Sequence, residues 1–62
     1  MHLSKKAQHR AQWMQEFEDM VITMQPKYTG KIEWNDAVYM YDNGYSTNTA
    51  ANRYIKNRED TA

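Results

Sequence analysis

The chain has 62 residues, a length that suits one small domain, and it has no cysteine, which excludes disulfides and thiolate metal sites. Eight Lys and Arg balance eight Asp and Glu, so net charge predicts neither a nucleic-acid binder nor an acidic mimic of one. No apolar run has the length of a signal peptide or a membrane span. We therefore expect one cytoplasmic domain over residues 1–62, with no membrane association.

The first predicted helix covers about residues 4–25. Its apolar residues have the three- and four-residue spacing of an amphipathic helix: Ala7, Ala11, Met14, Phe17, Val21 and Met24, with Trp13 and Met20 widening the stripe. Ser4 is the expected N-cap. Pro26 ends the helix because proline lacks a backbone donor and disfavours helical geometry in the residue before it. The wide apolar stripe is also the expected contact of a homodimer.

A second helix is predicted over about residues 31–43, after a turn at 26–30. One broad face can hold Ile32, Trp34, Ala37, Val38 and Tyr41. Thr29 and Asn35 are alternative N-caps, and Asp36 suits a first helical turn. Gly44 marks the end of this helix because glycine accepts the left-handed conformation found just past a helix C-terminus.

A third helix is predicted over about residues 46–58, starting from Ser46 as N-cap. Its buried face consists of Ala50, Ala51, Tyr54 and Ile55, and residues 59–62 are expected to fray. The fold class is therefore all-α: a three-helix bundle with a long first helix and a helix-turn-helix-like pair. Met and Tyr, which occur five times each, are expected to fill much of the core, since aliphatic residues are few.

Residues 36–50 resemble the helix-turn-helix of bacterial and phage DNA-binding domains. In that family a helix ends at Gly, an apolar residue follows, a Ser caps the next helix, and a Thr and a small residue come three and four positions later. The matching residues are Gly44, Tyr45, Ser46, Thr49 and Ala50. The chain differs from the family at Met40, which is usually small, and at Arg53, which is usually apolar. The resemblance implies a DNA-binding regulator of transcription that acts as a dimer.

The candidate DNA-reading residues lie on the outward face of the third helix: Asn48, Thr49, Asn52, Arg53 and Lys56. Asn suits adenine, Arg suits guanine, and Thr or Lys can hold a phosphate or a base edge. The same polar face also suits a helix that only satisfies its own ends and dipole. Both interpretations stay open.

Charge along the first helix is placed against its dipole, with cations at the start and acids in the second half. The cations are Lys5, Lys6 and Arg10, and the acids are Glu16, Glu18 and Asp19. A partner or a neighbouring helix can dictate such an arrangement. With Arg53, Lys56 and Arg58 the three cations could form one DNA-binding patch; the alternative is a solvated face.

The alternative function is binding of a host or partner protein through aromatic residues mixed with acids. The candidate residues are Trp34, Tyr39, Tyr41 and Tyr45, close in sequence to Glu33, Asp36 and Asp42. Such a surface repels DNA, so the two functions make different demands on the chain.

Catalysis and metal binding are not expected. His2 and His9 are seven positions apart, which on a helix separates them by about 10 Å, too far to share one metal ion. No spacing suggests a nucleophile with its base or a phosphate-binding loop. We predict no enzyme activity and no cofactor.

Overall fold

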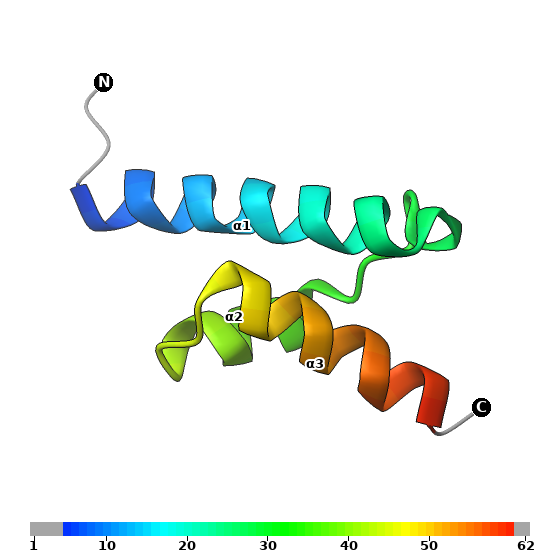
Figure 1. Cartoon of the computed structure of the whole chain (residues 1–62). Coiled ribbons are helices and arrows are strands. Elements are labelled where there is room, and N and C mark those ends of the chain that lie inside the picture. The colour runs from blue at the N-terminus through cyan, green and yellow to red at the C-terminus, as the bar shows by residue number, and fades with distance from the viewer. Residues whose placement is uncertain (1–4, 61–62) are drawn as a thin grey trace.

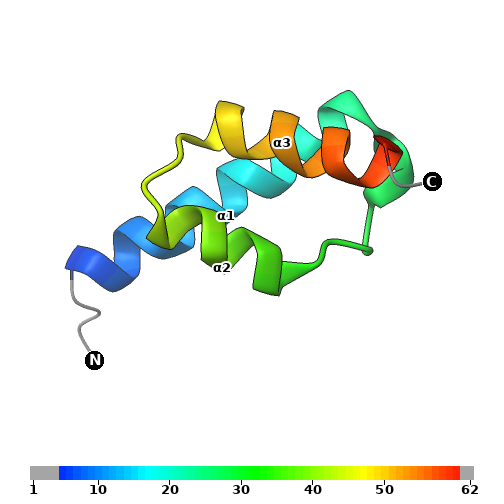
Figure 2. The same ribbon diagram turned by 90° about the horizontal axis from the view of Figure 1, so that it is seen from below.

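The computed structural model describes residues 5–60, with side-chain surroundings from residue 9 onward. The elements are α1 (Lys5–Met24), the short 3-10 helix η1 (Pro26–Tyr28), α2 (Trp34–Asp42) and α3 (Thr47–Asp60). α2 and α3 lie on the same side of α1 (Figure 1), and they run in opposite directions (Figure 2). The predicted all-α, three-helix fold with a long first helix is confirmed.

α1 contributes three fully or nearly fully buried side chains, Trp13, Phe17 and Val21, each four residues after the last. Trp13 and Phe17 stack with nearly parallel rings whose centroids are 5.5 Å apart. Met14 and Met20 pack against this row, but Ala11 and Met24 of the predicted stripe are exposed. The buried side of α1 is therefore centred on the Trp13 row, and this chain's own core uses it. Those side chains are not available as the predicted homodimer contact.

The break after α1 follows the prediction. Pro26 begins η1, and Gln25 before it has extended geometry with φ −141° and ψ 90°. Gly30 has a φ of +71°, which turns the chain back towards α2. The proposed Ser4 N-cap lies outside the described residues.

α2 begins later than predicted, at Trp34 instead of about residue 31. Its N-cap is Glu33, whose Oε1 accepts a hydrogen bond from the Asn35 backbone N–H at 3.3 Å. Neither predicted cap is therefore correct; Thr29 donates its hydroxyl to the Pro26 carbonyl at 2.8 Å. Asp36 does lie in the first turn. The buried residues of α2 are Ala37 and Met40, while Trp34 is exposed, contrary to the predicted face.

The turn from α2 to α3 has the hydrogen bonds of a Schellman motif, in which the two residues past the C-cap bond back to the last helical turn. The Gly44 N–H donates to the Tyr41 carbonyl at 3.0 Å, and the Tyr45 N–H donates to the Met40 carbonyl at 3.1 Å. Gly44 has a φ of +80°. Ser46 Oγ then accepts the Thr49 N–H at 3.2 Å and so caps α3. Both predictions for this turn, the glycine and the serine, are confirmed.

α3 buries Ala50, Ala51 and Tyr54 against α1, and Ile55 packs partly against the same core. Two alanines at the contact allow the helices to approach closely. The Tyr54 ring meets Phe17 edge to face at 5.5 Å, and its hydroxyl accepts the Glu33 N–H at 3.0 Å. Tyr54 thus joins all three helices at the centre of the core.

The C-terminal turns of α3 are tied to η1 and α2. Glu59 forms an ion pair with Lys27 at 2.6 Å and accepts a hydrogen bond from the Tyr28 hydroxyl at 3.4 Å. Arg58 pairs with Asp36 at 2.9 Å. α3 consequently continues to Asp60, two residues beyond the predicted end at about residue 58, because these contacts oppose the expected fraying at Glu59.

Candidate functional site

The outward side of α3 carries the predicted DNA-reading residues, and all five are exposed: Asn48, Thr49, Asn52, Arg53 and Lys56. This placement follows from the helical period, since Ala50, Ala51 and Tyr54 turn towards α1 and the residues between them turn away. The segment 47–58 contains no Asp or Glu. The exposed face of α3 is therefore polar and cationic up to Arg58, and its carboxylates, Glu59 and Asp60, are confined to the last turn.

Two amides are aligned along this face. The Asn52 side-chain amide donates to the Asn48 carbonyl oxygen at 2.9 Å and to its Oδ1 at 3.0 Å. Thr49, between them in sequence, accepts a hydrogen bond from the Ser46 hydroxyl at 3.0 Å. The first two turns of α3 therefore present hydrogen-bonding groups that are held by their neighbours.

Arg53 lies above the ring of Tyr45, with its guanidinium carbon 5.0 Å from the ring centroid. Such a cation–π contact leaves the edge of the guanidinium, with its N–H donors, open to solvent. It also gives a physical reason for the arginine at a position where the resembling family has an apolar residue: the side chain packs on the turn while keeping its charge exposed.

The six cations proposed as one patch do not come together. Arg58 pairs with Asp36 and lies over the Tyr54 ring at 4.3 Å. The end of α3 lies beside η1, which follows the C-terminus of α1, whereas exposed Arg10 lies near the start of α1. Figure 1 shows these ends of the molecule apart. Lys5 and Lys6 are in the first turn of α1, and their side chains lie outside the described part.

The four aromatic residues proposed for protein binding are also divided. Tyr39 is 66% exposed and Trp34 is 43% exposed. They are five positions apart on α2 and so point about 140° away from each other. Tyr41 and Tyr45 are half-buried and pack against the core. The aromatic residues therefore do not form the single face expected.

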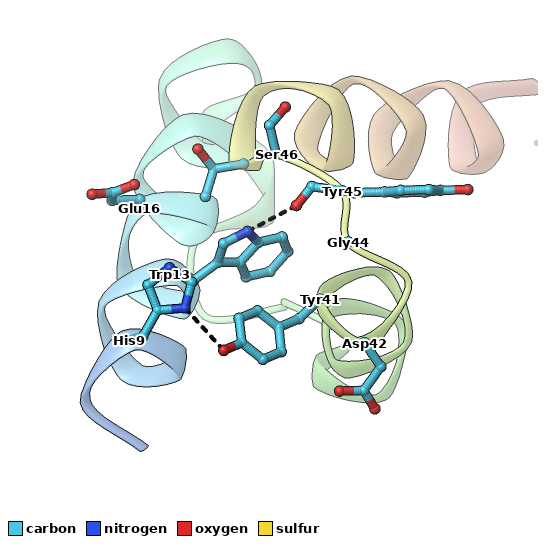
Figure 3. A pocket seen from close by; sticks show the side chains of 9 residues that line it. His9, Trp13, Glu16, Tyr41, Asp42, Gly44, Tyr45 and Ser46 are labelled. Atoms are coloured by element: carbon cyan, nitrogen blue, oxygen red, sulfur yellow. Dashed lines mark hydrogen bonds between the residues drawn. The ribbon is translucent and has the colours of Figure 1, made fainter. Parts of the chain in front are cut away.

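A hollow of about 600 Å³ lies between α1 and the α2–α3 turn (Figure 3). Two hydrogen bonds hold its walls together: Trp13 Nε1–H donates to the Tyr45 carbonyl at 3.0 Å, and His9 Nδ1 lies 3.0 Å from the Tyr41 hydroxyl. Glu16, Asp42, Ser46 and Thr47 are among the other lining residues. Sequence reasoning missed this site because each bonded pair is separated by 32 residues, beyond any local pattern.

One acid of α1, Glu16, lines this hollow together with Ser46 and Thr47 at the N-terminus of α3. Glu16 is in the middle of α1, beyond the last turn where the helix dipole disfavours an acid.

Within residues 5–60, no group of three or more His, Asp or Glu side chains is arranged to hold a metal ion. No helix in this described part has the length and apolarity to cross a membrane. Comparison of the chain with protein-family models, curated proteins and solved structures finds no match.

Proposed function

We propose that the chain binds double-stranded DNA through the outward face of α3, as a small regulator of the bacterial or phage helix-turn-helix type. The observation that carries this proposal is the exposure of Asn48, Thr49, Asn52, Arg53 and Lys56 on one face of α3, in a stretch, 47–58, that has no carboxylate. The capped turn before α3 supports it, because this turn holds the first residues of α3 at the surface.

The side chains of this face match the groups of the major groove. The Asn48–Asn52 pair offers amide donors and acceptors of the kind that bond adenine, and Arg53 offers the fork of donors that bonds guanine. Lys56, one turn further along, is exposed and supplies a charge of the kind that neutralises a phosphate. Each good base contact contributes about 1–3 kcal/mol of discrimination.

Dimerisation remains part of this proposal, since one such module makes a small interface for specific binding. The buried row of α1 is occupied, so a second copy has to use another surface. DNA half-sites arranged as an inverted repeat can bring two copies together without a stable dimer in free solution.

The test is fluorescence anisotropy with a labelled random-sequence duplex at about 50 and 200 mM salt, the range over which phosphate contacts weaken strongly. Binding that appears at low salt and falls at high salt supports the proposal. No binding at low salt overturns it.

Protein binding is the second candidate, favoured by Tyr39, which is 66% exposed on the side of α2 away from the core. Tyr39→Ala should abolish capture of a partner from a host lysate and leave helical circular dichroism unchanged. Tyr41→Ala is a poorer test, because Tyr41 contacts His9 and meets Trp13 edge to face at 5.4 Å. Capture that survives Tyr39→Ala contradicts this candidate.

A further inference from the structure

The α2–α3 turn contains the dipeptide Asn43-Gly44, whose side-chain amide and backbone nitrogen can react with each other. Asparagine is thermolabile because the backbone nitrogen of the next residue can attack its side-chain amide carbon. Glycine in the next position favours this attack, since it has no Cβ to obstruct the close approach. Both residues are exposed, and a Cβ added to Gly44 would meet no atom within 4 Å. Water therefore reaches the pair.

The reaction is a deamidation. The Gly44 nitrogen loses its proton and bonds to the Asn43 Cγ, while the side-chain nitrogen leaves as ammonia, which gives a five-membered cyclic imide. Water then opens the imide at either of its carbonyls. The product has aspartate at this position, or isoaspartate, in which the main chain runs through Cβ and is longer by one methylene. The only co-reactant is water.

The folded turn holds the reacting groups apart. Asn43 has φ −88° and ψ 5°, so the Gly44 nitrogen lies beside the Asn43 nitrogen when viewed along the Cα–C bond. Ring closure requires it beside Cβ, a rotation of ψ by about 120°. This rotation breaks the hydrogen bond from the Gly44 N–H to the Tyr41 carbonyl at 3.0 Å. The Asn43 amide must also leave the Tyr39 carbonyl, to which it donates at 2.7 Å. Cyclisation consequently needs the turn to open.

A contact from α1 opposes this opening. Trp13 Nε1–H donates to the Tyr45 carbonyl at 3.0 Å, directly after the reactive pair. We propose that Asn43 is a deamidation site which the folded α2–α3 turn protects, and that opening of this turn from α1 sets the rate of modification. This proposal does not depend on what α3 binds.

Either product weakens the turn. The longer main chain of isoaspartate displaces the Gly44 and Tyr45 N–H groups from the carbonyls they bond at the end of α2. Aspartate replaces an amide donor with a carboxylate next to the Tyr39 carbonyl, at the negative end of the α2 dipole. Deamidation therefore removes, irreversibly, contacts that position the start of α3.

The test incubates the whole chain at mildly alkaline pH, with and without denaturing urea, and maps deamidation by mass spectrometry of peptides made at acid pH. In urea, Asn43 should be modified faster than Asn35, Asn48 and Asn52, none of which precedes a glycine. Without urea its rate should be at least about tenfold lower, because only the opened fraction of molecules reacts. Equal rates at Asn43 in the two conditions, or no preference for Asn43 in urea, overturn the proposal.

Two variants distinguish opening of the turn from unfolding of the chain. Trp13→Phe removes the bond to the turn and should raise the rate in the folded protein by about fivefold or more. The matched control, Val21→Ala, weakens the core further along α1 and should raise the rate less for the same fall in melting temperature. Equal increases contradict control by the turn. If Trp13→Phe unfolds, Ser46→Ala replaces it, because this exposed residue caps α3 beside the turn.

Asn43→Asp reproduces the aspartate product and tests the consequence of modification. It should melt at a lower temperature than the wild type. Asn35→Asp, in the first turn of α2 where the helix dipole favours an acid, should not. Equal melting temperatures of Asn43→Asp and the wild type contradict the weakening of the turn.

Discussion

The indole Nε1 of Trp13 donates a hydrogen bond to the main-chain carbonyl of Tyr45 at 3.0 Å, which attaches the turn before α3 directly to α1. Because Trp13 also stacks on Phe17, one side chain belongs both to the core and to the wall of the hollow. The position of the start of α3, and of the residues that follow it, therefore depends on this contact.

Trp13→Phe keeps an aromatic ring in the core but removes the donor. We expect a loss of about 1–3 kcal/mol in the free energy of unfolding, from the unpaired Tyr45 carbonyl and the smaller ring. Urea unfolding followed by circular dichroism measures it. Trp34→Phe, at a 43% exposed position, is the matched control and should change stability little. Equal losses in both variants would contradict the assigned role of Trp13.

Gly44→Ala tests the turn itself. A Cβ at this glycine meets no atom within 4 Å, so strain comes from its φ of +80° alone. The expected loss is about 1–2 kcal/mol for a residue with a Cβ in left-handed geometry. Gly44→Asn should lose less, since asparagine tolerates this conformation better. Thermal melts that rank alanine above asparagine in stability would show that the turn is not held as described.

The Lys27–Glu59 ion pair predicts a pH dependence. The hydrogen bond and charge of Lys27 lower the pKa of Glu59, and Glu59 raises the pKa of Lys27. A carboxyl whose pKa is lowered on folding stabilises the fold above its unfolded pKa, and this contribution disappears as pH falls through the folded value. The stability difference between wild type and Glu59→Gln should therefore shrink from about pH 7 to about pH 3.

Both partners of this pair are exposed, so the effect should be small and should weaken with salt. Melting temperatures of the two proteins across this range measure it. A difference that stays constant with pH would mean that Glu59 acts through something other than its charge.

Arg53→Lys separates base reading from charge. Lysine retains the positive charge but lacks the planar fork of donors. If α3 binds DNA as proposed, Arg53→Ala weakens binding to a selected site by about tenfold or more. Arg53→Lys should have an affinity between those of Arg53→Ala and the wild type. Anisotropy titrations on selected and random duplexes measure both. Full recovery by lysine would assign Arg53 to phosphate contact.

The ends of the helices could be predicted from the sequence where a residue with a strong local conformational preference lies at the boundary. Pro26, Gly44 and Ser46 act on their immediate neighbours, and the chain breaks where they indicate. Glu33 was missed as a cap because glutamate is not among the preferred N-cap residues.

Long-range features were not predictable from one sequence. The helical period correctly placed five residues on the outward side of α3, opposite its buried side: Asn48, Thr49, Asn52, Arg53 and Lys56. The helical period did not show that Trp13, which lies at the edge of the apolar stripe predicted for the first helix, would lie in the middle of the core. Nor did the helical period predict the contact between His9 and Tyr41, because tertiary packing alone decides that contact.

The most direct test of DNA binding by α3 compares Lys56→Ala with Lys31→Ala, two exposed lysines that form no ion pair within the described residues. Each variant removes one charge, but only Lys56 lies on the proposed face. The dissociation constant for a random duplex is measured across salt concentrations. A phosphate contact by Lys56 predicts weaker binding and a salt slope smaller by about 1 for Lys56→Ala, with Lys31→Ala like the wild type. Equal slopes in the two variants, or no binding by the wild type at low salt, would contradict it.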